Sequence, residues 1–316
     1  MTGGPFFDEL ERGQRFETAP SLTLTVGHAA LHQAIVGDRL RLALDATLSA
    51  RVLGGPLAHP ALVCDVSIGQ STLATQRVIG NLFYRGLVLR RSPLIGDTLR
   101  TTTEVVALRQ TSRKSGRPAV GLAVLRIRTI DQEDRRVLDY WRCAMLPLRD
   151  SDGRTGHDDD LAAIPAELDA DALRTAVDGW DLGVVPRAPW PEEGTSWRIE
   201  GGDVVSVAPE LARLSLNIAT AHHDAGDGRR LVYGGHTIGL AASQAARALP
   251  DLLTIVAWHS CDHLGPVYEG DTLHSTLELE RLEPLPERGA LAHLRSRVRA
   301  TGERDVLDWR FVGVLP

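Results

Sequence analysis

The sequence predicts an α+β protein built from two copies of one unit, each a long helix packed on a curved antiparallel sheet. Gly-Asp-Thr-Leu at residues 96–99 recurs at 270–273, a shift of 270 − 96 = 174 residues. Val-Leu-Asp followed by an aromatic residue occurs at 137–140 and again at 306–309, and each copy closes on Leu-Pro. In both copies one long helical stretch precedes a run of strands, an order that is typical of α+β proteins.

Each copy begins with helical segments. A short one is expected at residues 27–36 and at 209–216, where Pro209 suits a first helical turn. A polar motif loop follows. An Ala-rich amphipathic helix comes next and is clearest at 237–249, where apolar residues recur every three to four positions. The chain therefore places a loop rich in polar residues directly before its longest helix.

Strands make up the rest of each copy. They are rich in Thr, Val and Leu or alternate apolar with polar residues, as half-buried antiparallel strands do. A lone copy would leave the edge of its sheet uncovered, so we expect the two copies to pack together as a pseudo-dimer. The expected strands are 98–108, 120–129 and 137–146 in the first copy, and 272–282, 291–300 and 306–315 in the second.

The chain of 316 residues is long enough for two domains, each with its own core. We place an N-terminal domain at 1–149 and a C-terminal domain at 191–316. Between them, residues 150–190 form an acidic linker with a short helical stretch at 161–177.

Composition excludes several classes of partner. The net charge is −6 and no Lys/Arg cluster is present, so neither nucleic acid nor an anionic membrane surface is an expected partner. No apolar stretch approaches the roughly 20 residues that span a bilayer, and residues 1–16 lack the pattern of a signal peptide. Cys64, Cys143 and Cys261 are far apart and odd in number, which indicates reduced thiols in a cytoplasmic protein.

The motif loops of the two copies differ where chemistry is expected. Aligning residues 37–45 with 216–224 puts His222 opposite Ala43 and Asn217 opposite Asp38. Histidine is the side chain whose ordinary pKa of about 6.5 suits proton transfer near neutral pH. An amide five residues earlier can hold a water against the imidazole. The alternative is that His222 only caps a solvent-facing loop, and Asp38, left without a histidine, is interpreted as structural.

Gly234 and Gly235 stand where the second long helix begins. Amide groups at a helix N-terminus are bare and are assisted by the helix dipole, so they can bind the oxygen of a thioester as it gains enolate charge. The 174-residue shift puts Gly234 opposite Pro60, which has no N–H to donate. The first copy thus lacks both the histidine and the donor, which suggests that they belong to one site. The alternative is a glycine pair needed only for packing.

These residues resemble the MaoC-type (R)-specific enoyl-CoA hydratases, and most closely the duplicated form that includes the mesaconyl-CoA hydratases, also called β-methylmalyl-CoA dehydratases. The resemblance implies a double hot-dog fold. It also implies a hydro-lyase acting at the α,β double bond of an acyl-CoA thioester, with no cofactor beyond the CoA of the substrate. His222 matches the family's catalytic histidine, and Gly234 or Gly235 its oxyanion amide. Asn217 stands where single-domain hydratases have an aspartate, so base work would fall on His222 alone.

Other polar residues near the motif are weaker candidates for substrate binding. Asp224 and Asp227 could compensate for the missing aspartate, or could simply be solvated. His236 opens the long helix and either lines the pocket or packs on the sheet. Arg229 and Arg230 could hold CoA phosphates or a substrate carboxylate, although exposed arginines are usually just solvated.

A metal site is not expected. His259, Asp262 and His263 are close in sequence, but strand spacing sends His259 and His263 to one face and Asp262 to the other. No further ligand completes a set.

The residues leave the reaction open among three classes: a hydratase or dehydratase, an acyl-CoA thioesterase of the same fold, and a non-catalytic or tailoring acyl-thioester-binding protein of a biosynthetic pathway. The acyl group, the carrier (CoA or acyl-carrier protein), the direction of reaction and a homodimer of the pseudo-dimeric chain also stay open.

Overall fold

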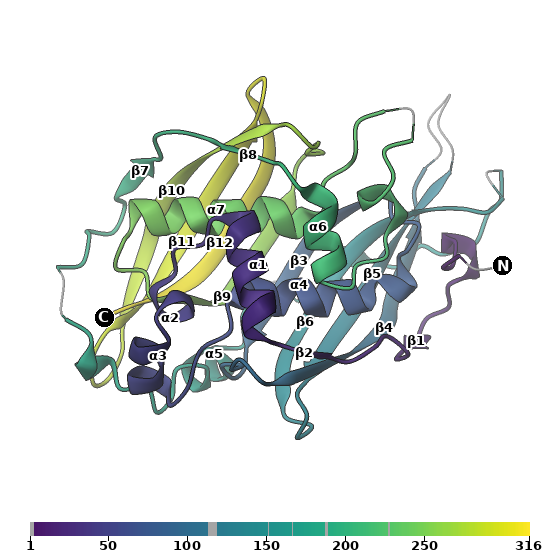
Figure 1. Ribbon diagram of the computed structural model, residues 1–316. Coiled ribbons are helices and arrows are strands. Elements are labelled where there is room, and N and C mark those ends of the chain that lie inside the picture. The colour runs from purple at the N-terminus through teal and green to yellow at the C-terminus, as the bar shows by residue number, and fades with distance from the viewer. Residues whose placement is uncertain (1–2, 113–118, 151, 166, 187–188, 227) are drawn as a thin grey trace.

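The computed structural model describes residues 3–112, 119–150, 152–165, 167–186, 189–226 and 228–316. Two matching series of elements build it, each a long helix followed by four long strands (Figure 1). The predicted α+β class is confirmed. The first series is α4 (Pro60–Gln70), β3 (Gly80–Leu89), β4 (Thr98–Gln110), β5 (Val120–Ile130) and β6 (Arg136–Pro147); the second is α7 (Gly234–Ala248), β9 (Thr254–His263), β10 (Thr272–Pro284), β11 (Ala290–Ala300) and β12 (Arg304–Leu315).

The two half-sheets form one continuous antiparallel sheet because β3 pairs with β9. The strand order is β1-β4-β5-β6-β3-β9-β12-β11-β10-β7. The edge that a lone copy would expose is therefore paired with its counterpart. The short outer strands are β1 (Arg15–Phe16), β2 (Leu22–Thr23), β7 (Ser196–Arg198) and β8 (Asp203–Val204).

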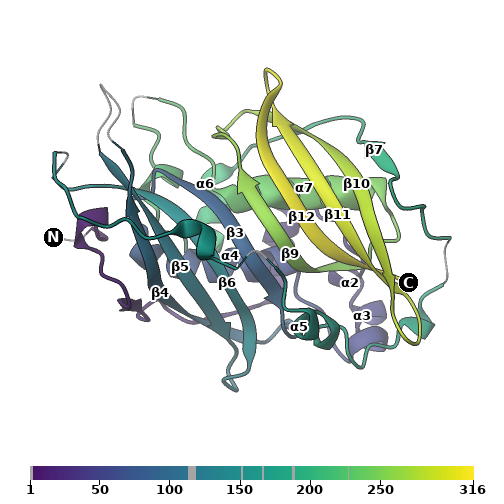
Figure 2. The same ribbon diagram turned by 180° about the vertical axis from the view of Figure 1, so that it is seen from behind.

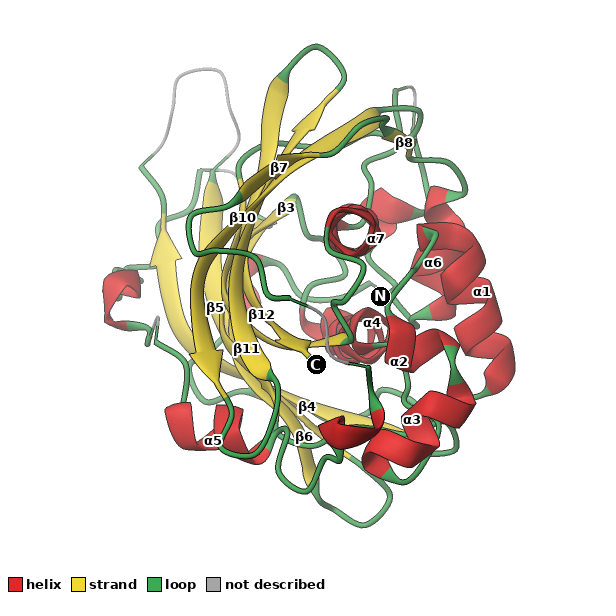
Figure 3. Ribbon diagram, turned by 90° about the vertical axis from the view of Figure 1, so that its left-hand side faces the viewer, coloured by secondary structure: helices red, strands yellow, loops and turns green. Residues whose placement is uncertain are grey.

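The sheet curves around α4 and α7, which lie side by side in its concave face (Figure 3). Helices α1 (Val26–Val36) and α6 (Ala208–Leu214) form a further layer outside them. This sandwiching explains why every residue of α4 is buried. The remaining helices are α2 (Arg41–Leu44), α3 (Ala46–Leu53), α5 (Ala170–Thr175) and the 3-10 turns η1 (Phe7–Glu9), η2 (Ser71–Ala74), η3 (Leu161–Ala163), η4 (Leu182–Val184) and η5 (Thr220–His222). No described helix is both long and apolar enough to span a bilayer.

Each motif loop packs against the long helix of the other copy. The Ser243 hydroxyl of α7 donates to the carbonyl of Gly37, which follows α1. In the opposite sense, the amide of Ile218, after α6, donates to Thr72 in the turn that follows α4. The loop that carries the candidate histidine is thus held by both copies, and the site lies at their junction.

Several expected boundaries differ from the structure. Strands β3 and β9, which join the two halves, were not predicted. Helix α7 starts at Gly234, three residues earlier than expected, because the two glycines form its first turn. The acidic segment does not run free of the domains: the amide of Gln110 in β4 donates to the His157 carbonyl, and the segment leads along the sheet to α5 (Figure 2).

The expectation that His259 and His263 share a face of β9 is wrong. The register between β9 and β12 shifts between Trp258 and Ser260, so His259 lies in a β-bulge that reverses the alternation of side chains. His259 contacts His293 of β11 at 2.8 Å (Nε2 to Nδ1). His263 instead lines the cavity described below.

Candidate active site

A cavity of about 460 Å³ lies where the second motif loop, the start of α7 and the turn between α4 and β3 meet. This volume is within the range of small-molecule sites. Both copies supply its walls. The lining residues include Thr72, Thr75, Val78, Ile79, Asn81, Tyr84, Arg142 and Met145 from the first copy, and Asn217, Ala219, His222, Leu231, Tyr233, Gly234, Thr237, His263, Val267 and Tyr268 from the second.

His222 ends η5 and is held by one hydrogen bond. Its Nδ1 lies 3.1 Å from the carbonyl oxygen of Leu231. Because a carbonyl only accepts, Nδ1 carries the proton and Nε2 is left as the acceptor. Burial lowers the pKa of His222 to about 4, so the ring is neutral at pH 7. A neutral imidazole with a free Nε2 can accept a proton inside the cavity.

Asn217 is oriented by the backbone around it. The amide of Ala219 donates to Oδ1 at 2.9 Å, which identifies that atom as oxygen and leaves Nδ2 as the other end of the carboxamide. His223 Nε2 lies 2.6 Å from the Asn217 carbonyl and braces the same residue. Asn217 and His222 line the same cavity. The amide can therefore donate to a water or substrate oxygen there, but it cannot take a proton.

Gly234 and Gly235 are the first two residues of α7, after the extended Tyr233. Their amides have no acceptor within the helix. A Cβ on Gly234 would lie 2.6 Å from the His263 ring, and one on Gly235 would lie 2.1 Å from Asp65 Oδ1, so side chains at both positions would clash. Gly234 lines the cavity with His222, whereas Gly235 is not among the lining residues. The structure thus brings three predicted residues together and sets Gly235 behind them.

Two of the predicted candidates, Asp224 and His236, do not line the cavity. Asp224 is exposed, and its Oδ1 accepts the amide of Gly226 at 2.8 Å. Asp227 lies outside the described residues. His236 is buried on another side of α7, where burial lowers its pKa to about 4, and it does not line the cavity.

The predicted arginines are engaged in ion pairs beside the cavity. Arg229 pairs with Asp271 at 2.7 Å, and its guanidinium stacks 4.9 Å from the centre of the Tyr268 ring, which lines the cavity. Arg230 pairs with Glu269. A role for either one in holding CoA phosphates stays a prediction.

Asp38 in the first copy does have a histidine. His59 Nε2 lies 2.8 Å from Asp38 Oδ1, and both side chains are buried. The same oxygen accepts the amide of Leu40 at 2.9 Å, just as Asn217 accepts that of Ala219. His59 comes from the N-cap of α4, a position that the motif alignment does not reach. Asp38 therefore has a histidine partner that the motif alignment did not predict, while its interpretation as a structural residue stays a prediction.

Sequence reasoning assigned no role in the site to several polar residues of the cavity, among them Tyr84, Arg142, Tyr233 and His263. Burial lowers the pKa of His263 to about 4. No group of three or more His, Cys, Asp or Glu side chains gathers in a metal-binding arrangement within the described ranges.

The sequence of the chain is similar to those of two proteins with named activities. No protein-family model matches the chain. It is 29% identical to β-methylmalyl-CoA dehydratase of Chloroflexus aurantiacus, over 98% of this chain and 91% of the relative. It is also 29% identical to mesaconyl-CoA hydratase of Cereibacter sphaeroides, over 91% and 87% respectively.

Solved structures agree on the fold. RV0216 of Mycobacterium tuberculosis, described as a double hotdog protein, is 52% identical with a TM-score of 0.91, and the match covers 99% of each chain. A MaoC domain dehydratase of Chloroflexus aurantiacus is 24% identical with a TM-score of 0.86, over 99% of this chain and 97% of that one. The predicted double hot-dog fold is confirmed.

Proposed function

Because the chain belongs to the MaoC-like double hot-dog family, we propose that it is a hydro-lyase that adds water across, or removes it from, the α,β double bond of an acyl-CoA thioester. The observation that carries the proposal is that a buried neutral imidazole and a bare helix N-terminus share one cavity. The named activities of two relatives agree with this chemistry and make mesaconyl-CoA or β-methylmalyl-CoA the first substrates to test.

Hydration begins with a water held between two groups of the motif loop. Asn217 Nδ2 donates to the water oxygen, and the water donates to His222 Nε2. His222 takes the proton as the oxygen attacks the β carbon. Because burial lowers the pKa of His222 to about 4, the imidazolium that forms is a strong acid. It returns its proton to the α carbon, and water has then been added in full.

The thioester oxygen gains negative charge between these two steps. The Gly234 amide, at the positive end of α7, donates to that oxygen. The Cβ clash at Gly234 means that only glycine gives the ligand close access to this amide without moving His263. The first copy supplies the opposite wall, from Thr72 to Tyr84.

The test is a panel of short, branched and dicarboxylic enoyl-CoAs, with loss of the conjugated double bond and release of free thiol followed in the same reaction. We expect the double bond to be lost without thiol release. Thiol release would favour the thioesterase. Tight binding with no turnover on any substrate would favour the non-catalytic binder.

A further inference from the structure

Arg142 places a positive charge inside the cavity. It lies on β6, lines the cavity and is only 3% exposed. Its register partner on the neighbouring strand β3 is Tyr84, which lines the same cavity. The charge of Arg142 also reaches His222: burial is the main cause of the low pKa of that histidine, and Arg142 lowers it further. The guanidinium and the imidazole thus belong to residues that line one cavity.

No carboxylate among the described residues forms an ion pair with Arg142. One of its terminal nitrogens donates to the Thr75 hydroxyl, while its buried Nε has no hydrogen-bond partner. By contrast, two partly exposed arginines on other strands have carboxylate partners: Arg126 bonds Asp139 through two nitrogens, and Arg295 bonds Asp308 in the same way. A buried charge without a counter-ion is costly, so the cavity is arranged for an anion that the protein itself does not supply.

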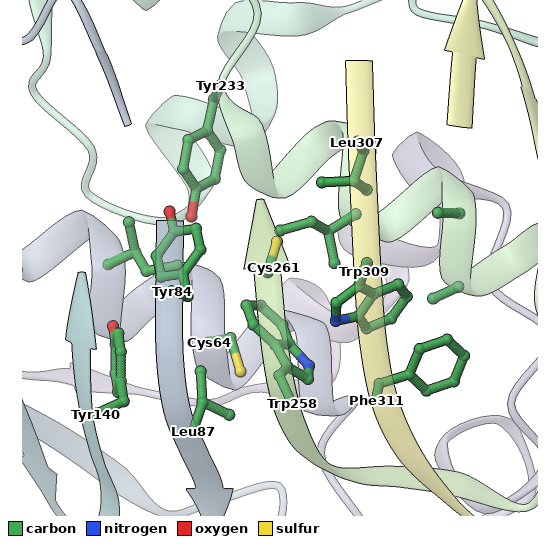
Figure 4. Close-up of a cluster of buried hydrophobic side chains, with 14 of the residues drawn as sticks. Cys64, Tyr84, Leu87, Tyr140, Tyr233, Trp258, Cys261, Leu307, Trp309 and Phe311 are labelled. Atoms are coloured by element: carbon green, nitrogen blue, oxygen red, sulfur yellow. The ribbon is translucent and has the colours of Figure 1, made fainter. Parts of the chain in front are cut away.

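The matching position of the second copy is occupied by a different kind of residue. Aligning Val-Leu-Asp at 137 with the same residues at 306, a shift of 306 − 137 = 169, puts Phe311 opposite Arg142. The 174-residue shift puts Trp258 opposite Tyr84, and Trp258 and Phe311 are register partners just as Tyr84 and Arg142 are. Figure 4 shows Trp258 and Phe311 in one buried cluster with Tyr84, which lies beside Tyr233. The fold therefore accepts an aromatic residue here and does not need an arginine.

We propose that Arg142, with Thr75, forms a carboxylate-binding subsite, so that the substrate is the monothioester of a short unsaturated dicarboxylic acid. The identity of the substrate rests on the proposed function, whereas binding of a carboxylate by Arg142 does not depend on the reaction. The carboxylate of the acyl chain receives charge-assisted hydrogen bonds from the guanidinium. Arg142 and His222 line the same cavity of about 460 Å³, and this volume limits the length of the acyl chain that fits between them.

The test measures binding of saturated thioesters, which cannot be hydrated. Glutaryl-CoA and valeryl-CoA have the same chain and differ in a terminal carboxylate or methyl group; succinyl-CoA and butyryl-CoA form a second such pair. We expect the wild-type protein to bind the carboxylate member about 10 to 100 times more tightly. Arg142→Gln keeps a donor for Thr75 but removes the charge, so this preference should disappear while binding of the neutral member changes less than about threefold.

Two further variants separate recognition from folding. Arg142→Phe reproduces the second copy and should lose the preference with a near-native melting temperature. Arg310 directly precedes Phe311 on β12, pairs with Glu280 at 2.9 Å and does not line the cavity. The control variant Arg310→Gln should therefore retain the preference for the carboxylate member. Equal affinities of the wild-type protein within each pair would overturn the subsite. So would a preference that survives in Arg142→Gln.

Failure of the hydratase proposal would look different. If the protein binds glutaryl-CoA more tightly than valeryl-CoA but hydrates no enoyl-CoA, the proposed subsite stands and the proposed reaction is wrong. The enzyme could instead hydrate neutral and dicarboxylic enoyl-CoAs at equal rates, with Arg142→Gln slowing both equally. The proposed reaction would then stand and the proposed subsite would be wrong.

Discussion

The cavity and its counterpart, the region that the repeat relates to it, show how equivalent positions of one fold can carry either polar or apolar side chains. Shifted by 174 residues, Thr72, Thr75 and Leu231 correspond to Ala246, Leu249 and Leu57. The two β-bridges Leu57–Leu94 and Leu231–Tyr268 confirm that the positions match in space. Around the counterpart, the side chains are mostly apolar and buried.

The polar residues follow the same division. The second copy has His222 and an amide-bearing Gly234, where the first has Ala43 and Pro60. The first copy keeps one buried polar pair, Asp38 with His59, but closes it on itself. Asp38 and His59 face each other in the protein interior, whereas the imidazole of His222 lines a cavity and is left for a ligand. The two copies therefore differ mainly in whether their polar side chains face a cavity or face other protein groups, and less in which residue types they contain.

The largest expected effect comes from making the second copy like the first at residue 222. His222→Ala should lower kcat by at least about 100-fold, because it removes the group proposed to move the proton. Circular dichroism and the melting temperature should stay close to wild type. Adding Ala43→His to this variant should not restore turnover, since Pro60 offers no amide beside it. Wild-type rates in His222→Ala would remove the mechanism.

The proposed oxyanion amide can be tested by a matched pair of variants. In a His263→Ala background, which relieves the clash at Gly234, Gly234→Ala keeps the amide and Gly234→Pro deletes it. Proline is tolerated at a first helical position, and the extended backbone of Tyr233 is compatible with it. We expect kcat of the proline variant to be about 100-fold below that of the alanine variant. Equal rates in the two variants would show that the amide is not used.

The smallest effect is a change of pH profile at Asn217. The pKa of His222 is lowered to about 4 by burial, so kcat/KM of the wild-type enzyme should stay level as pH falls from 7.5 to 5.5. Asn217→Asp should fold normally, because Asp38 makes the same backbone bond in the first copy. The new carboxylate favours the imidazolium, raises the pKa of His222 and moves the acid limb to higher pH.

The pH profile is interpreted only over the pH range in which circular dichroism shows that the protein is folded. A wild-type acid limb centred near pH 6.5 would contradict the low pKa of His222. An Asn217→Asp limb that does not move would show that residue 217 does not face the imidazole.

The repeat itself was readable from the sequence. Gly-Asp-Thr-Leu and Val-Leu-Asp anchor turns and strands whose local patterns are strong, so β4 to β6 and β10 to β12 fall close to their expected bounds. The same repeat pointed to His222, Asn217 and Gly234 by contrast with the first copy. It also held the signal for Arg142, since the match that runs from Val137 to the closing Leu-Pro sets Arg142 opposite Phe311.

Other features were decided by tertiary structure. β3 and β9 are buried and interrupted by register shifts, so they lack the alternation that marks a strand in sequence. His59 meets Asp38, and Gly235 faces Asp65, only because helices from different parts of the chain pack together. Local patterns record which residues alternate or repeat along the chain. Which side chain faces a cavity and which faces a partner depends on contacts between distant segments, and these exist only once the sheet has closed around α4 and α7.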